Sequence, residues 1–192
     1  MNCRVISLQL TCLVADFSAE PIAIQTFLPK EPLCGSLAYE DEVKSLEQIT
    51  SVAKRAFLGT AVAVPESIRS ALKELIGDRS PETIDRIRVL EHSTFARLHG
   101  RVRATTRRRY IFVRGSGAEF FADPALVLHE YCHVLLQWES GALTVPRYMH
   151  ECLRRGYWNN RYEVEARAFA DRHLSQFRAL VTAAVARDPR SN

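Results

Sequence analysis

The sequence lacks any long apolar run. No segment has the roughly 20 consecutive apolar residues that a membrane-spanning helix needs, and no internal repeat is visible along the 192 residues. We therefore expect no contact with a membrane. With 47% hydrophobic residues, the chain can bury one substantial core. We expect one main domain over residues 46–187, preceded by a variable segment and linker at 1–45 and followed by a tail at 188–192.

Cysteine is scarce and has no paired spacing. Five cysteines, an odd number, argue against a disulfide framework and fit a reducing compartment. The start of the chain alternates like a strand at Ile6, Leu8 and Leu10, and it is too polar for the core of a signal peptide. We expect a cytoplasmic protein, with export as an effector as the alternative, and we expect Cys132 to pack inward.

Positive charge exceeds negative charge by only +4, but arginines concentrate in one short stretch. The stretch contains Arg101, Arg103, Arg107, Arg108 and Arg109. Such a run suggests nucleic-acid binding as an alternative function. No nucleic-acid motif accompanies it, and a solvated turn or an acidic protein partner is the commoner reason for such a run. We therefore do not expect a nucleic-acid partner.

One segment has the features of a well-bounded helix. Asp123 can cap its first amide groups, Pro124 fits the first helical position, and Gly141 can adopt the left-handed conformation that ends a helix. Apolar residues at three- and four-residue spacing predict a core-facing stripe formed by Leu128, Cys132, Leu135 and Leu136. This helix is therefore expected to be anchored on one side.

The same helix carries His129-Glu130-Tyr-Cys-His133, an HExxH motif. Residues four apart lie about 40° from each other around a helix, so the two imidazoles converge, with Glu130 beside them. Neutral imidazoles suit zinc, and a carboxylate can accept a proton from a metal-bound water whose pKa the ion lowers to about 7. We predict His129 and His133 as metal ligands and Glu130 as the general base. Hydrogen-bonded core histidines are the plainer alternative, but they leave three polar groups in need of partners.

A catalytic zinc ion usually has a third protein ligand. The histidine of the metzincin pattern is absent, because His150 lacks the glycine that precedes it in that family. A carboxylate is therefore favoured, and two are available in the stretch Glu163-Val-Glu165-Ala-Arg-Ala-Phe-Ala. An ordinary solvated helix face is the alternative reading of this stretch.

HExxH together with Glu-x-Glu-Ala and a following Phe-Ala resembles the gluzincin-type peptidases. The resemblance implies that Glu163 is the third ligand and that Ala166 lets two helices approach. Glu165 is the alternative ligand, because two residues this close on a helix cannot both face the ion. Relatives often have an acidic residue after the alanine to support a histidine, where this chain has Arg167. Asp171 or a backbone carbonyl is then the expected support.

Residues 80–175 are also similar to uncharacterised bacterial zincin domains, which often occur in proteins linked to toxins or contractile injection systems. The similarity implies a compact α+β zincin-like domain with a small antiparallel sheet beside the motif helix and further C-terminal helices. It also implies an effector or toxin as a partner. It does not identify a substrate.

The remaining elements follow from local patterns. Residues 102–106 and 110–113 predict a hairpin, which serves either as a platform for an extended peptide or as core scaffolding. Further helices are expected at 46–57, 65–76, 146–155 and 161–185.

The predicted function is that of a zinc metallopeptidase acting on a protein or peptide substrate. Its site needs a donor for the developing oxyanion. The candidates are Tyr148, His150, Tyr157, Tyr162 and His173. An inactive zinc-binding interaction module and a basic nucleic-acid-associated protein are the alternative functions. Manganese or iron can occupy the same ligand set in vitro.

Overall fold

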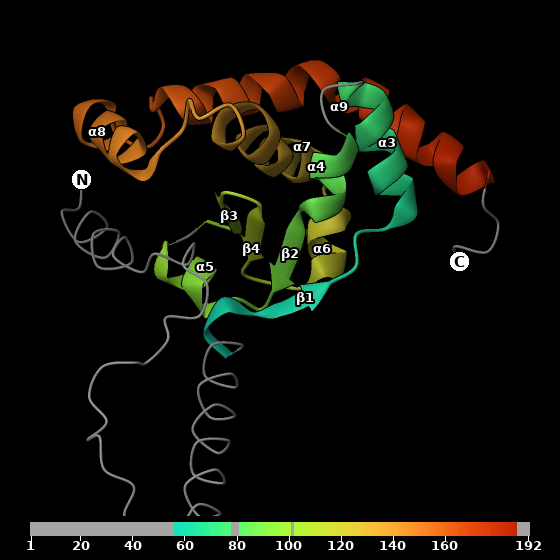
Figure 1. Ribbon diagram of the computed structural model, residues 1–192, viewed down its shortest axis with the longest axis horizontal. Coiled ribbons are helices and arrows are strands. Elements are labelled where there is room, and N and C mark those ends of the chain that lie inside the picture. Colours follow the sequence, from blue (N-terminus) through green and yellow to red (C-terminus); the bar gives the residue numbers. More distant parts are fainter. Residues whose placement is uncertain (1–55, 78–80, 101, 188–192) are drawn as a thin grey trace, which may run out of the picture.

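The computed structural model describes residues 56–77, 81–100 and 102–187, which form an α+β fold (Figure 1). The strands are β1 (Thr60–Val62), β2 (Arg88–Glu91), β3 (Ala104–Arg107) and β4 (Tyr110–Val113). The helices are α3 (Glu66–Ile76), α4 (Pro81–Arg86), α5 (Thr94–Leu98), α6 (Gly117–Phe121), α7 (Pro124–Cys132), η2 (His133–Trp138), α8 (Val145–Arg155) and α9 (Arg161–Arg187). The predicted segment 1–45, the tail and most of the helix at 46–57 lie outside the described residues.

The four strands form one mixed sheet in the order β1-β2-β4-β3. The predicted hairpin is confirmed, because β3 pairs antiparallel with β4 in a register that places Thr106 opposite Ile111. The prediction of a purely antiparallel sheet is wrong, since β2 pairs with β4 in parallel. A parallel neighbour needs a long crossover connection, and here α5 and β3 provide it. β3 is left at one edge of the sheet.

Both faces of the sheet are covered, and alternate residues of the central strands face opposite sides. Val89 and Ile111 belong to the main core, which also includes residues of α3, α7 and α9. Leu90 and Phe112 belong to a smaller cluster on the other face with Phe95 of α5. The main core therefore fixes α7 and α9 relative to the sheet.

The predicted motif helix is present, but within the motif it changes from an α-helix to a π-helix. Asp123 caps α7 by accepting a hydrogen bond from the Leu126 amide, with Pro124 in the first turn. From His133 the chain continues as the π-helix η2, in which the Glu139 amide donates to the Val134 carbonyl. Gly141 has the predicted left-handed conformation, with φ of 71°. π-helical turns occur often at functional sites.

The apolar stripe of this helix is broader than predicted. Leu128 and Cys132 are buried as expected, whereas Leu135 and Leu136 are only partly buried. The prediction missed the side of the helix that packs most deeply. That side carries Val127, Tyr131 and Val134. The helix is covered on more than one face, so its core contact extends beyond one line of residues.

The two C-terminal helices lie close to their predicted bounds. In Figure 1, α9 runs along the top of the molecule and α7 lies beneath it. Ala166 is fully buried, which is consistent with its expected role in letting two helices approach. Across the described residues, no helix combines the length and apolar character needed to cross a bilayer.

Candidate metal centre

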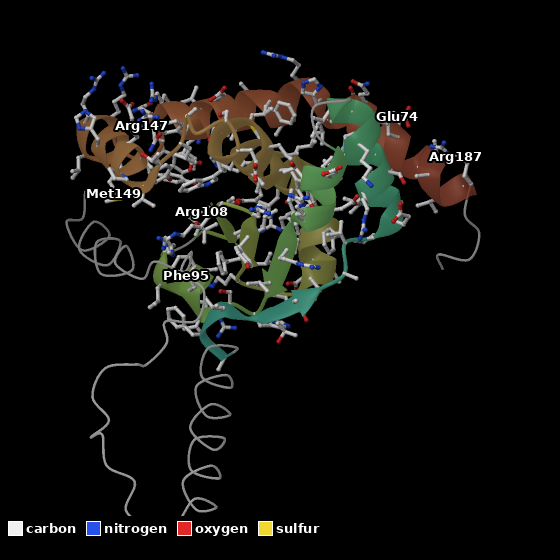
Figure 2. The ribbon with its side chains drawn as sticks, in the orientation of Figure 1. Glu74, Phe95, Arg108, Arg147, Met149 and Arg187 are labelled. Carbon is white, nitrogen blue, oxygen red and sulfur yellow. The ribbon has the colours of Figure 1, made fainter. Side chains whose placement is uncertain are left out.

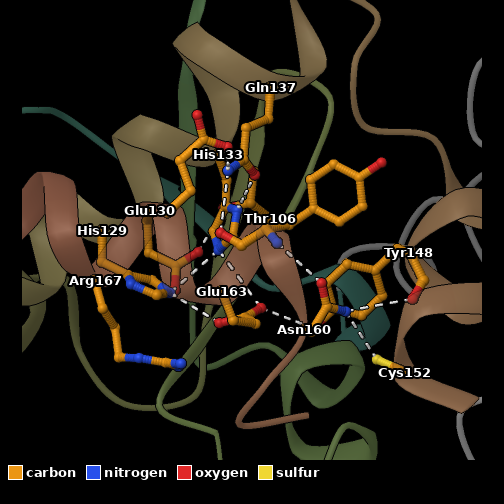
Figure 3. Close-up of polar contacts among 12 residues, drawn as sticks. Thr106, His129, Glu130, His133, Gln137, Tyr148, Cys152, Asn160, Glu163 and Arg167 are labelled. Carbon is orange, nitrogen blue, oxygen red and sulfur yellow. Dashed lines mark hydrogen bonds and ion pairs between the residues drawn. The ribbon is translucent and has the colours of Figure 1, made fainter. Parts of the chain in front are cut away.

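Three of the predicted site residues meet where η2, α7 and α9 pack together (Figure 3). The Nε2 atoms of His129 and His133 are 3.1 Å apart. Glu163 places Oε2 3.2 Å from His129 Nε2 and Oε1 3.6 Å from His133 Nε2. Tetrahedral ligands about 2.0–2.2 Å from a zinc ion lie about 3.3–3.6 Å from one another. The three side chains are therefore spaced so that they could hold one metal ion.

The electrostatics of this cluster favour a cation. Burial opposes the ionisation of Glu163, but the contact with His129, the charge of His133 and a hydrogen bond from Tyr148 lower its pKa to about 2. Burial also lowers the pKa of His129, but the contact with Glu163 and the charge of Glu130 outweigh burial and raise it. A buried carboxylate against two imidazoles needs a positive charge, which a proton or a metal ion can supply.

Gln137 fixes the orientation of the His133 ring. Its amide nitrogen donates to the Tyr162 carbonyl at 3.0 Å and to Glu165 Oε2 at 2.9 Å. The amide oxygen therefore faces His133, where it accepts a hydrogen bond from Nδ1 at 2.7 Å. With the proton on Nδ1, the Nε2 lone pair points into the cluster and is free to bind a metal ion.

The residue that supports His133 differs from the ones expected from the sequence. Asp171 is exposed and takes no part in the cluster, and Gln137 rather than a backbone carbonyl holds His133. Arg167, which stands where relatives often have an acidic residue, donates instead to the Trp158 carbonyl. Gln137 was not predicted as a site residue, although a polar residue four positions after His133 inside an apolar helix was the available signal.

The two glutamates of α9 have different surroundings. Glu163 is 4% exposed and lies with the histidines, where Tyr148 donates a hydrogen bond to its Oε1 at 2.7 Å. Among the described residues, its Oε2 receives no well-directed hydrogen bond. Glu165 instead accepts the hydrogen bond from Gln137. The structure therefore places Glu163 with the two histidines and Glu165 in the layer behind them.

Glu130 lies beside the three clustered residues and is not one of them. It is 4% exposed, and Thr106 of the edge strand β3 donates a hydrogen bond to its Oε2 at 2.5 Å. This contact joins residues 24 positions apart. It fixes one carboxylate oxygen and leaves the other available to a water molecule. Sequence analysis placed Thr106 in the hairpin but did not assign it this role.

A pocket of about 120 Å³ opens onto the cluster. It is lined by the two histidines, by Glu130 and Glu163, and by β3 from Ala104 to Arg107. Much of the remaining wall is apolar and comes from α5, η2, α8 and the loops that precede β3 and α8. It includes Phe95, Val102, Trp138, Leu143, Val145 and Met149. The pocket can therefore hold an apolar group next to the candidate metal ligands.

Of the five candidate oxyanion donors, Tyr148 and Tyr157 line this pocket. Burial and the nearby Glu163 carboxylate raise the pKa of both phenols, so they stay protonated and can donate. The hydroxyl of Tyr162 instead donates to the Ala142 carbonyl.

The two remaining candidates lie elsewhere. His150 is exposed on α8, and the His173 ring packs against Phe169 on α9.

Comparison of the chain with family models, curated proteins and solved structures found no match.

Proposed function

We propose that this protein is a zinc-dependent metallopeptidase with a zincin-like fold and a gluzincin-type ligand set. The observation that carries the proposal is the meeting of His129, His133 and Glu163 around one point, with Glu130 beside them at the end of a pocket. Two imidazoles and one carboxylate form the ligand set of many catalytic zinc sites, which keep the fourth position for water or substrate.

The described side chains suggest a division of labour. A bound zinc ion would lower the pKa of a water molecule to about 7 and polarise the carbonyl of the peptide bond. Glu130 would accept the proton of the attacking water and then pass it to the leaving amine. Thr106 holds the Glu130 carboxylate in place for both transfers.

The pocket also suggests how a peptide binds. β3 is an edge strand that lines the pocket, so an extended peptide can pair with it as an additional strand. Tyr148 and Tyr157 reach the same pocket as protonated donors and would stabilise the oxyanion. The Tyr148 hydroxyl has one proton, which it donates to Glu163 in the described structure, so Tyr148 would turn this proton toward the oxyanion once Glu163 held the metal ion.

The proposal is tested by metal analysis and by peptide hydrolysis with matched variants. The wild-type protein should bind one zinc ion and cleave peptides from a mixed library, with the products identified by mass spectrometry. Glu130→Gln should keep the zinc and lose hydrolysis, because the amide cannot accept the proton. Glu163→Ala should lose the zinc. Glu165→Ala should retain most of it, since Glu165 accepts a hydrogen bond from the supporting Gln137 amide and is not one of the three clustered residues.

Two outcomes would contradict the proposal. Unchanged turnover in Glu130→Gln would reject the role of this residue as general base. A wild-type protein that binds zinc but cleaves nothing in the library would support the alternative of an inactive zinc-binding module.

A further inference from the structure

Exposed apolar side chains gather at one end of the molecule. The described residues expose six large hydrophobic side chains, and four of them lie within a stretch of twelve residues: Leu153, Tyr157, Trp158 and Val164. Leu153 is 65% exposed and Trp158 is 69% exposed. Single exposed apolar residues are ordinary, whereas a local concentration marks a binding surface. We refer to residues 153–164 together with Arg167 as the α8–α9 rim.

The loop in the α8–α9 rim is held in a fixed conformation. Asn160 is fully buried, donates to the Tyr148 carbonyl at 3.3 Å and accepts from the Tyr162 amide at 3.0 Å. The Trp158 ring packs edge-on against Tyr157, with centroids 5.5 Å apart. A rigid, exposed aromatic side chain loses little conformational entropy when a partner covers it.

The α8–α9 rim adjoins the candidate metal centre. Tyr157 belongs to both, because it lines the pocket and packs against Trp158. Arg167 places its guanidinium 5.6 Å from the centre of the Trp158 ring. Its charge also acts on His129, and Figure 3 shows the two side chains together. A peptide that extends out of the pocket would therefore pass over the rim.

The α8–α9 rim carries one sign of charge on its surface. Residues 152–162 contain three arginines and no acidic residue. Glu163 is buried in the metal centre, and Arg154, Arg161 and Arg167 form no ion pair with any acidic side chain in the described part of the chain. Figure 2 shows two further arginines on this side of the molecule, Arg147 on α8 and Arg108 at the hairpin turn.

We propose that the α8–α9 rim binds an acidic peptide segment through an apolar anchor placed against Trp158. The substrate class would then be peptides in which an apolar residue is flanked by Asp or Glu; only the cleavage of such peptides rests on the proposed function. A peptide can place its uncharged backbone beside Glu130 and Glu163 while its acidic side chains lie over the arginines. A nucleic acid carries charge at every nucleotide and would bring phosphates to those carboxylates.

The experiment measures binding without turnover. The full chain with Glu130→Gln is titrated against a fluorescent peptide of alternating acidic and apolar residues, by anisotropy, with zinc and with a chelator. Trp158→Ala should weaken binding at least about tenfold, as expected for a central aromatic anchor, and Trp158→Phe should restore much of it. Arg154→Glu and Arg161→Glu should weaken binding and reduce its dependence on salt.

Matched controls lie on the same helix. Val185→Ala and Arg187→Glu change exposed residues more than about 30 Å along α9 from Arg161, and neither should alter binding. A peptide with Lys in place of each acidic residue should bind at least about tenfold more weakly.

The proposal would be overturned by equal binding of the acidic and basic peptides. It would also be overturned if Trp158→Ala left peptide binding unchanged, or if that substitution abolished binding to vesicles of anionic lipid or to an oligonucleotide while no peptide bound. Selective peptide binding by a protein that cleaves nothing would reject the proposed peptidase function and leave the rim assignment standing. Cleavage of peptides without selectivity for acidic ones would support the peptidase function and reject the rim assignment.

Discussion

Replacing Gln137 by Leu should weaken both zinc binding and the fold, because one buried amide supports three groups at once. Gln137 is 1% exposed and makes hydrogen bonds to His133, the Tyr162 carbonyl and Glu165. Leucine fills a similar volume without polar atoms. The exposed Glu165 can turn to water, and the Tyr162 carbonyl keeps its bond within helix α9, but the His133 Nδ1–H group is left buried without a partner.

The size of both effects follows from these contacts. A buried polar group without a partner costs about 1–3 kcal/mol, so the free energy of unfolding of the metal-free protein should fall by about 1–3 kcal/mol. Loss of the partner that orients a ligating histidine reduces metal affinity by about 10- to 100-fold. Zinc affinity is measured by competition with a chromophoric chelator, and stability is measured by urea unfolding in the presence of a strong chelator.

A second pair of variants separates orientation from packing. Gln137→Glu keeps an acceptor for His133 but places a carboxylate against Glu165, so zinc affinity and stability should both fall. In the double variant with Glu165→Gln, the amide at position 165 can donate to the carboxylate at position 137. This reversed hydrogen bond should restore most of the lost zinc affinity and stability. The reasoning would be refuted if Gln137→Leu bound zinc within about twofold of wild type, well short of the effect expected for such a support, or if the double variant were no better than Gln137→Glu alone.

Three further predictions concern other contacts of the site and its helix. Thr106→Val keeps the side-chain shape but removes the 2.5 Å hydrogen bond to Glu130. The kcat should fall by about tenfold or more with zinc content unchanged. Turnover equal to that of the wild type would argue against a positioning role for Thr106. Tyr148→Phe should lower kcat by about 100-fold and retain zinc, whereas a change in KM alone would show that the hydroxyl contributes only to substrate binding. Asp123→Ala should reduce the free energy of unfolding by about 1 kcal/mol, because it removes the cap of α7. Burial opposes ionisation of Asp123, but hydrogen bonds from the Leu126 amide and Arg103 lower its pKa. The charge of Asp123 therefore stabilises the fold above the unfolded-state pKa. This contribution is lost as the pH falls through the lowered pKa of the folded state. Asp123→Asn should accordingly show a smaller loss of stability in acid than wild type, measured by urea unfolding at several pH values.

The parts of the site that sequence analysis could predict are those set within one helix. The convergence of His129 and His133, the cap at Asp123 and the left-handed Gly141 depend only on local spacing and backbone preference. Glu163 needed the resemblance to known peptidases, because nothing local relates it to a helix 30 residues earlier in the chain.

The parts that could not be predicted depend on long-range packing. Thr106 meets Glu130 only after β3 and α7 have packed together, and Gln137 meets Glu165 only after η2 and α9 have done so. The parallel pairing of β2 with β4 was missed for the same reason, since local alternation predicts a strand but not its neighbour. The local spacing predicts one regular helix here, and not the π-helical turn that begins at His133. Buried polar residues inside apolar patterns, such as Gln137, are the signal that sequence analysis can use for such contacts.

The arrangement of the candidate site separates residues that would hold the metal from residues that would recognise a substrate. His129, His133 and Glu163 lie on helices fixed by the main core, and Gln137 supports His133 by a direct hydrogen bond. The edge strand and the α8–α9 rim contact the same pocket from the surface, where substitutions disturb little packing. Substitutions in the rim should therefore change which peptide binds and leave zinc affinity constant. Substitution of Gln137 should instead change zinc affinity, whichever peptide is offered.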